Sequence, residues 1–429
     1  MSSAVSIPCS AHPISRAQIH SGALKVLNTL KQAGFTSYLV GGCVRDLMLG
    51  REPKDFDVVT DARPEEIRRL FRNVRLIGRR FRLAHVRFGR EIIEVATFRA
   101  LPRTGDDDET AQQRTDKGRI LRDNVFGTQE EDALRRDFTV NALYYDIQNY
   151  SVIDYVGGVD DLKRGLVRII GDPETRYRED PVRLLRAVRF SVKLGFKIEP
   201  ATLAPIRELG HLLLDVPPAR MFEEVLKLFH GGYALESFEL LRKYELSQYL
   251  FPMTEKALTS EHNGYARALV PLALASTDTR VQEGKPVTPA FLFAFLLWDP
   301  VRLEMEAHLE QGQTRHDALR LAAGMIVAEQ SQHVAIPRRI AVPMREIWAL
   351  QPRFQRRSGA QAFRFVQNER FRAAYDFLLL RAQAGETERE LSDWWTRFQE
   401  ADEPQRRAMV RQVSAARRTA RKKRRRRKA

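Results

Sequence analysis

The sequence predicts an α+β protein, in which a region of strands and helices is followed by a region of helices alone. From Tyr38 to about Asp154, short apolar runs with a two-residue period alternate with runs of helical period. From about residue 160 onward, only the helical period recurs. Strands followed by a long series of helices are typical of α+β architecture. We therefore expect a first region that contains a sheet and a second region without one.

Charge gives the strongest indication of a partner. The 429 residues carry a net charge of +16, which indicates a polyanion such as nucleic acid or an anionic membrane surface. Eleven Lys or Arg and no acid fall within residues 411–429, which we expect to be disordered and to bind nucleic acid. No apolar helical face accompanies these charges, so we expect no membrane partner.

Cysteine usage and the N-terminus bear on the compartment. Only Cys9 and Cys43 occur, which is too few for a disulfide framework and favours a reducing cytoplasm. The N-terminus has no long apolar run, so we expect no secretory signal. The most apolar stretch, residues 290–298, is too short to span a bilayer and predicts a buried helix.

A glycine pair ends the first apolar strand. Gly41 and Gly42 follow Tyr38-Leu39-Val40 and precede a short helical run. Glycine allows backbone amides to approach a ligand closely, and a helix that starts there directs N–H groups toward an anion. This pattern indicates a phosphate-binding turn.

Two carboxylates follow on the next expected strand, at Asp55 and Asp57. Side chains two residues apart on a strand share a face, so the two acids should point the same way. Carboxylates on one rigid face, together with substrate phosphates, can hold Mg2+. Glu94, which lies inside an apolar strand, is a candidate third metal ligand, although a solvated strand edge explains it nearly as well.

Arg135, Arg136 and Asp137 form the next cluster. Guanidinium groups bind phosphate bidentately, so these arginines suit a triphosphate. Asp137 could orient them, contact the ribose or contribute near the metal. A helix cap with a local ion pair is the alternative.

A further acid-arginine pattern runs from Glu179 to Arg189. Arg183 and Arg186 share a helix face, and Asp180 lies near Arg183. An arginine donor beside a carboxylate acceptor can read the base edge that adenine and cytosine share, so the pair could admit ATP or CTP. The alternative is an exposed i,i+3 ion pair of little energetic consequence.

These residues resemble the bacterial poly(A) polymerase and tRNA CCA-adding nucleotidyltransferase family, the class II branch of the polymerase-beta-like superfamily. Its first motif matches Leu39-Val40-Gly41-Gly42-Cys43-Val44-Arg45-Asp46 and Asp55-Phe56-Asp57. Its second motif matches Leu134-Arg135-Arg136-Asp137-Phe138-Thr139-Val140-Asn141-Ala142-Leu143, and its base-selecting motif matches Glu179-Asp180-Pro181-Val182-Arg183-Leu184-Leu185-Arg186. Residues 79–86, 171–178 and 371–376 and the arginine-rich end favour the poly(A) polymerase branch.

The resemblance implies a polymerase-beta-like head with a small mixed sheet, followed by a helical neck, body and C-terminal region. We expect a flexible leader over 1–17, the head over 18–160, the neck over 161–230, the body over 231–405 and a disordered basic tail over 406–429. Asp55 and Asp57 would hold Mg2+, and Asp137 would belong to the active site. The nucleotide contacts would be Gly42, Arg45, Arg136, Arg183 and Arg186.

The expected activity is adenylyl transfer from ATP to RNA 3′ ends in RNA processing and decay, with RNA-decay proteins as possible partners. Addition of CCA to tRNA is the first alternative, because adenine and cytosine present the same hydrogen-bonding pattern. An RNA-binding protein with an inactive head is the second, and the intact acids argue against it.

Overall fold

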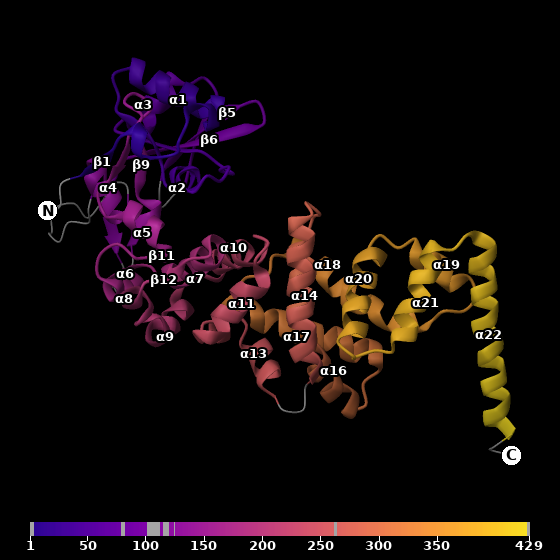
Figure 1. Cartoon of the computed structure of the whole chain (residues 1–429). Coiled ribbons are helices and arrows are strands. Elements are labelled where there is room, and N and C mark those ends of the chain that lie inside the picture. Colours follow the sequence, from indigo (N-terminus) through magenta and orange to yellow (C-terminus); the bar gives the residue numbers. More distant parts are fainter. Residues whose placement is uncertain are drawn as a thin grey trace. The chain divides into compact units, whose positions relative to one another are not determined.

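The computed structural model describes residues 4–78, 82–100, 112–114, 120–123, 125–260 and 264–426. The chain divides into two compact units, residues 1–212 and 213–429 (Figure 1). The boundary falls inside the range predicted as the neck. Most of residues 101–120 lie outside the described residues.

The first unit is built on a mixed sheet, as predicted. The described strands have the order β1-β10-β9-β2-β3-β6-β5-β4, and only β3 and β6 are parallel neighbours. Their bounds are β1 Val5–Ile7, β2 Ser37–Val40, β3 Asp57–Thr60, β4 Val74–Ile77, β5 Leu83–Phe88, β6 Glu91–Thr97, β9 Leu143–Tyr145 and β10 Val152–Asp154. Two small sheets pair β7 (Gln112–Arg114) with β8 (Ile120–Asp123) and β11 (Leu166–Val167) with β12 (Lys197–Ile198).

Helices pack against both faces of the main sheet. On one face, the buried side chains include Val58 and Val95, and α1 (Ser21–Gln32) and α3 (Pro64–Leu70) pack against these strands and their neighbours. On the other face, α4 (Gln129–Arg135) contributes to a buried cluster that comprises Val40, Val59, Phe98, Ala133 and Tyr144. Asp57 lies two residues from Val59 and therefore sits on the α4 face, at the border of this cluster.

The unit is completed by α2 (Gly42–Met48), α5 (Gly158–Arg164), α6 (Pro173–Glu179), α7 (Val182–Leu194), α8 (Pro200–Leu203) and α9 (Ile206–Leu209). The flexible leader expected over residues 1–17 is corrected by the structure. Val5–Ile7 pairs with β10 as an edge strand of the main sheet, and His12 Nε2 lies 2.8 Å from the Tyr150 carbonyl oxygen. A three-residue strand is too short to show a periodicity in sequence, and its order comes from pairing with a distant strand.

The described part of the second unit is helical, as predicted. Its helices are α10 Pro218–Phe229, α11 Ala234–Lys243, α12 Ser247–Leu250, α13 Pro252–Thr259, α14 Gly264–Gln282, α15 Pro289–Leu296, α16 Trp298–Glu310, α17 Arg315–His333, α18 Arg338–Leu350, α19 Ala360–Val366, α20 Phe371–Gln383, α21 Arg389–Glu400 and α22 Glu403–Arg426. The most apolar stretch of the sequence forms the buried helix α15. Within the described residues, no helix is both long and apolar enough to cross a bilayer.

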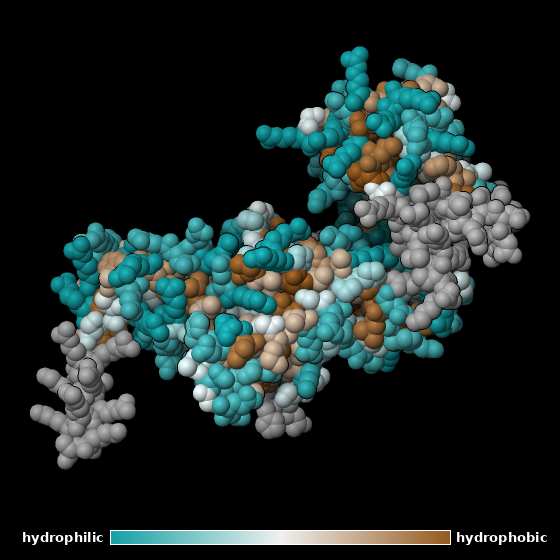
Figure 2. All heavy atoms as spheres, turned by 180° about the vertical axis from the view of Figure 1, so that it is seen from behind, coloured by the Kyte–Doolittle hydropathy of each residue, from teal (hydrophilic) through white to brown (hydrophobic). Residues whose placement is uncertain are grey.

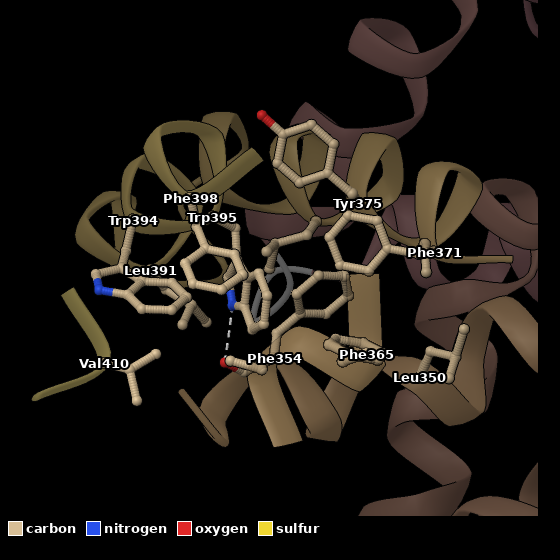
Figure 3. Close-up of a cluster of buried hydrophobic side chains, with 13 residues drawn as sticks. Leu350, Phe354, Phe365, Phe371, Tyr375, Leu391, Trp394, Trp395, Phe398 and Val410 are labelled. Atoms are coloured by element: carbon tan, nitrogen blue, oxygen red, sulfur yellow. Dashed lines mark hydrogen bonds between the residues drawn. The ribbon is translucent and has the colours of Figure 1, made fainter. Parts of the chain in front are cut away.

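A dense aromatic cluster organises the C-terminal part of this unit (Figure 3). Phe354, Trp395 and Phe398 are fully buried in it, and the Trp395 indole donates to the Phe354 carbonyl at 2.9 Å. Trp348 is likewise fully buried. Trp348 and Phe354, which lie among the arginines of residues 338–357, therefore belong to the core and are not exposed for stacking on bases.

The first part of the basic tail differs from the prediction of disorder over 406–429. Residues 403–426 form α22, and Val410 joins the buried cluster with Met409 and Val413 packed against it. Charged residues outnumber the apolar residues of this segment, so the apolar ones do not stand out in the sequence. Figure 2 shows the resulting surface of both units from one side, mostly hydrophilic with small hydrophobic patches.

Candidate active site

The glycine bend joins β2 to α2. Gly41 has φ 77° and ψ −127°, a conformation that side-chain-bearing residues avoid, and its N–H donates to the Leu143 carbonyl at 3.1 Å. A Cβ on Gly41 would stand 3.4 Å from Arg136 Nη1 and 3.6 Å from the Asn141 carbonyl oxygen. Because α2 spans only seven residues, its dipole is a minor part of any anion site here.

Asp57 opens β3 next to this bend. The β2–β3 register pairs Leu39 with Val58, and one step further it places Asp57 opposite Val40, the residue before Gly41. The Cys43 thiol, in the first turn of α2, donates a long 3.9 Å bond to the Asp57 carbonyl oxygen. The acid and the bend are therefore neighbours, as the sequence predicts.

The pKa of Asp57 is raised to about 6, first by burial and then by Glu94. Arg136 opposes this rise and Asp55 adds to it, so these charges all lie within electrostatic reach of Asp57. Asp55 itself is exposed and precedes the strand, so its nearness to Asp57 does not come from strand alternation. A half-buried carboxylate held among acids suits an oxygen-binding cation such as Mg2+.

Glu94 lies directly opposite Asp57 across the parallel β3–β6 pair. Its Oε1 is 3.1 Å from His85 Nε2, and 48% of its side chain is exposed. Within the described ranges, no three His, Cys, Asp or Glu side chains converge on a metal position. A metal bound here would therefore draw part of its coordination from substrate phosphates.

Arg136, at the end of α4, directs one part of its guanidinium to the bend. Its Nε and Nη2 donate to Asp132 Oδ2 at 3.1 and 2.8 Å, and Nε also donates to the Tyr144 hydroxyl at 3.2 Å. Burial lowers the pKa of Arg136, but Asp132 and Tyr144 more than compensate, so the net shift is upward. No hydrogen bond among the described residues uses Nη1, the nitrogen beside Gly41. This group can donate to a phosphate at the bend.

Asp137 pairs with Arg186 of α7. Its Oδ2 accepts from Arg186 Nε at 2.6 Å, and its Oδ1 accepts from the Phe138 N–H at 2.8 Å and from Asn141 Nδ2 at 3.2 Å. Burial raises the pKa of Asp137, but Arg186 and these hydrogen bonds lower it to about 2. Of the roles predicted for Asp137, this geometry fits the orientation of an arginine.

Arg45 is 2% exposed and is held inside the site. Its Nη1 donates to Asn141 Oδ1 at 2.6 Å, its Nε donates to Asp46 Oδ1 at 2.8 Å, and its guanidinium lies 5.4 Å from the Phe190 ring centre. Asn141 thus links Arg45 to Asp137. A direct contact between Arg45 and a triphosphate stays a prediction.

Arg183 is held by a backbone carbonyl and by Glu179. Its Nη1 donates to the Arg176 carbonyl at 2.6 Å and to Glu179 Oε2 at 3.1 Å, while the Asp180 carbonyl accepts from the Arg183 backbone N–H at 3.0 Å. Arg183 is 9% exposed. A base-reading pair of Asp180 and Arg183 therefore stays a prediction, with Glu179 as the carboxylate that fixes the arginine here.

Sequence reasoning missed several supporting residues. Asp132 holds Arg136, and the i,i+4 spacing of the two on one helix is a signal that could have found it. Arg176 donates to the carbonyls of Arg135 and Arg136, which ties α6 to the end of α4. No local sequence pattern indicates this long-range contact.

A mixed sheet that carries carboxylates beside an arginine-lined glycine bend defines a nucleotidyltransferase head of the polymerase-beta-like fold. Three family models match segments of the chain, and their descriptions agree with this interpretation. They are described as "Poly A polymerase head domain" over residues 37–168, "Probable RNA and SrmB- binding site of polymerase A" over 195–258 and "Polymerase A arginine-rich C-terminus" over 311–429.

Curated relatives extend the match over nearly the whole chain. The chain is 50% identical over 412 residues to poly(A) polymerase I of Escherichia coli O6:H1, which covers 95% of this chain and 88% of the relative. It is 46% identical to poly(A) polymerase I of Haemophilus influenzae, over 93% and 89% of the two chains. The chain belongs to the poly(A) polymerase I family.

CCA-adding enzymes are more distant relatives. The CCA-adding enzyme of Lactobacillus helveticus is 38% identical over 226 residues, which are 53% of this chain and 54% of the relative. Among solved structures, the Bacillus stearothermophilus CCA-adding enzyme in complex with CTP matches with a TM-score of 0.60 and 27% identity, over 88% and 80% of the chains.

Proposed function

We propose that this protein is a template-independent poly(A) polymerase, which transfers AMP from ATP to RNA 3′ ends and releases pyrophosphate. The observation that carries the chemistry is the position of Asp57 beside the Gly41 bend, within electrostatic reach of Asp55, Glu94 and Arg136. The choice of ATP and RNA is supported by 50% identity with a poly(A) polymerase I over 95% of the chain.

Asp55 and Asp57 are the proposed Mg2+ ligands, with Glu94 as a candidate third. Burial and the neighbouring acids disfavour the charged form of Asp57, and a bound cation would remove that penalty. When bound, Mg2+ activates the RNA 3′-hydroxyl and neutralises charge on the departing pyrophosphate.

The chain's own residues then have distinct tasks. Gly41 and Gly42 let the triphosphate approach the backbone, and Arg136 Nη1 donates to it. Asn141 holds Arg45, and Asp137 holds Arg186, so that these cations keep fixed positions around the nucleotide. These contacts cost no reorganisation during the reaction, which is the condition for effective electrostatic stabilisation.

Asp180 and Arg183 are proposed to read the adenine edge, which offers N1 as an acceptor and the N6 amino group as a donor. Glu179 would keep Arg183 from rotating away. Cytosine offers the same pattern, so these groups alone do not reject CTP, and CCA addition is the second candidate function. The sequence match to the Lactobacillus helveticus CCA-adding enzyme covers about half of this chain, which favours poly(A) synthesis.

We further propose a cytoplasmic location and contact with RNA-decay proteins. Both cysteines are free, which fits a reducing compartment. The match of residues 195–258 to a model described as a probable RNA- and SrmB-binding site supports a protein partner.

The test is a product-length gel with a single nucleotide in each reaction. Wild-type protein with Mg2+, ATP and a short RNA primer should give long tails, whereas CTP should give little extension. The Asp55→Ala/Asp57→Ala protein should retain less than about 1% of the activity, because two metal ligands are removed.

Two results would contradict the proposal. CTP-dependent addition of three nucleotides to a tRNA that lacks its 3′ end would establish CCA addition instead. Unchanged RNA binding without pyrophosphate release from any nucleotide would make the protein a non-catalytic RNA binder.

A further inference from the structure

A row of polar residues crosses four neighbouring strands of the head and starts at Asp57. The strand registers pair Asp57 with Glu94, Glu94 with His85 and His85 with Arg75, on β3, β6, β5 and β4. Directly paired residues project from the same face of a sheet. These four side chains therefore share the face of the sheet that carries the candidate active site.

The opposite face of these strands is closed. Val95, Ala84 and Val86 alternate with the polar row and are at most 2% exposed, where α1 and α3 pack on the strands. The polar side is open at its outer end. Arg75 and Arg87 are exposed, and Ile92, which is paired with Arg87, is 43% exposed. The β5–β6 hairpin that carries most of these residues is labelled in Figure 1.

We define this open area as the β4–β6 face, with Arg75, His85, Arg87, Ile92 and Glu94 as its residues. Across the described part of the chain, no ion pair or side-chain hydrogen bond engages Arg75 or Arg87. The acid of the face, Glu94, is occupied by His85 at 3.1 Å. The face therefore offers two arginines and one apolar side chain to a ligand.

The β4–β6 face is continuous with Asp57, and this position limits which ligand it can bind. Three inter-strand steps of about 4.8 Å separate Asp57 from Arg75, a path of roughly 14 Å. In the proposed reaction, the RNA 3′-hydroxyl must lie at Asp57, and the nucleotides behind it need a surface that accepts phosphates. The β4–β6 face starts at that point and carries exposed positive charge.

We propose that the β4–β6 face binds the last nucleotides of the RNA primer. This inference rests on the proposed function and adds the place where the primer approaches. Arg87 and Arg75 contact phosphates, and Ile92 packs against a base or ribose. His85 holds the Glu94 carboxylate and so limits its repulsion of the RNA backbone.

The first test is the variant Arg75→Ala/Arg87→Ala. We expect the KM for RNA to rise about tenfold, which corresponds to a loss of about 1.4 kcal/mol in binding free energy, with kcat and the KM for ATP within about twofold of wild type. The dependence of the RNA KM on salt should also flatten, because fewer phosphates are contacted.

The matched control is Arg68→Ala/Arg69→Ala. These arginines are exposed on α3, which packs on the closed face, so the control removes the same charge from the other side of the sheet. Its RNA KM should equal that of wild type. If both double variants behave alike, or if the KM for ATP rises instead, the proposal is wrong.

A second measurement does not depend on activity. RNA primers with one 4-thiouridine at the second, third or fourth nucleotide from the 3′ end are cross-linked to the full-length protein. Adducts within residues 74–94 are the expected result, and adducts confined to other segments would overturn it. If the wild-type protein does not extend RNA with ATP at all, the proposed function fails, which this experiment separates from failure of the primer surface.

Discussion

At Asp57, the fold places a carboxylate where its charge is disfavoured. Burial is the first cause and Glu94 the second, and together they raise the pKa to about 6. Asp137 shows the opposite behaviour in the same unit, because Arg186 and two hydrogen bonds outweigh its burial and lower its pKa to about 2. The two acids therefore suit different tasks: Asp137 is stably charged and holds an arginine, whereas the charged form of Asp57 would gain from the cation proposed to bind there.

We predict that Asp57→Asn stabilises the metal-free head. An acid whose pKa is higher in the folded state than in the unfolded state stabilises the fold only while it is protonated, and this contribution disappears as the pH rises through about 6. The gain from Asn should therefore reach at most about 3 kcal/mol near pH 7.5 and fade as the pH approaches 4. Hydrogen exchange of the β2 and β3 amides in EDTA measures it separately from the second unit.

Magnesium supplies the internal control for this prediction. It should protect the wild-type head at pH 7.5 and protect Asp57→Asn much less, because one charged ligand is gone. Equal protection of both proteins by Mg2+, or a less stable variant at pH 7.5, would contradict the electrostatic account.

At the scale of elements, local patterns predicted some features well and others poorly. The β2–Gly41–α2 bend, the β5–β6 hairpin and α7 are marked by glycine, alternation and helical period, and they form within one or two residues of the expected positions. The partner of Arg183 could not be predicted in this way. Glu179 and Asp180 precede Arg183 by four and three residues, and the contact of Arg183 with Glu179 is made across the break between α6 and α7.

Elements that depend on distant partners were the ones missed. Val5–Ile7 is ordered by β10, almost 150 residues away along the chain, and the apolar residues of α22 are ordered by an aromatic cluster. Likewise, Asp55 and Asp57 were expected to share a face through strand alternation, but β3 begins only at Asp57. Asp55 lies within electrostatic reach of Asp57, and it does so from the segment before the strand.

The glycine bend can be tested as an element. Gly41→Ala should destabilise the head by about 1–3 kcal/mol, the usual cost of a side chain in a disfavoured backbone conformation. It should also raise the KM for ATP, because the added Cβ stands 3.4 Å from Arg136 Nη1 where phosphate is proposed to bind. Steady-state kinetics at saturating RNA measure this effect.

Gly34→Ala is the matched control, since Gly34 has φ 86° but an added Cβ there meets no atom within 4 Å. It should reduce stability without any change in the KM for ATP. A normal KM for ATP in Gly41→Ala would show that the bend does not receive the triphosphate.

At the scale of the whole molecule, both units carry positive charge with a proposed role in holding RNA. In the head this is the pair Arg75 and Arg87, close to the chemistry. In the second unit it is the end of α22, whose first part is anchored by Val410 and by Arg406, which donates to the Phe398 carbonyl at 2.7 Å. The anchored and the charged parts of α22 are consecutive, so stability and RNA binding should be separable along this one helix.

Deletion of residues 416–429 provides that separation. It removes ten Lys or Arg and leaves Met409, Val410 and Val413 in place. RNA affinity should fall, and the slope of log affinity against log salt should flatten by up to about 0.7 for each RNA phosphate that the shortened protein no longer neutralises. The unfolding of the second unit should be unchanged.

Replacing the same ten residues by Gln should reproduce the drop in affinity, because charge and not chain length is responsible. Deletion from residue 403, in contrast, should destabilise the second unit by exposing the aromatic cluster. If the shorter deletion leaves both affinity and salt slope unchanged in filter-binding titrations, the tail does not bind RNA, and the head must supply the phosphate contacts.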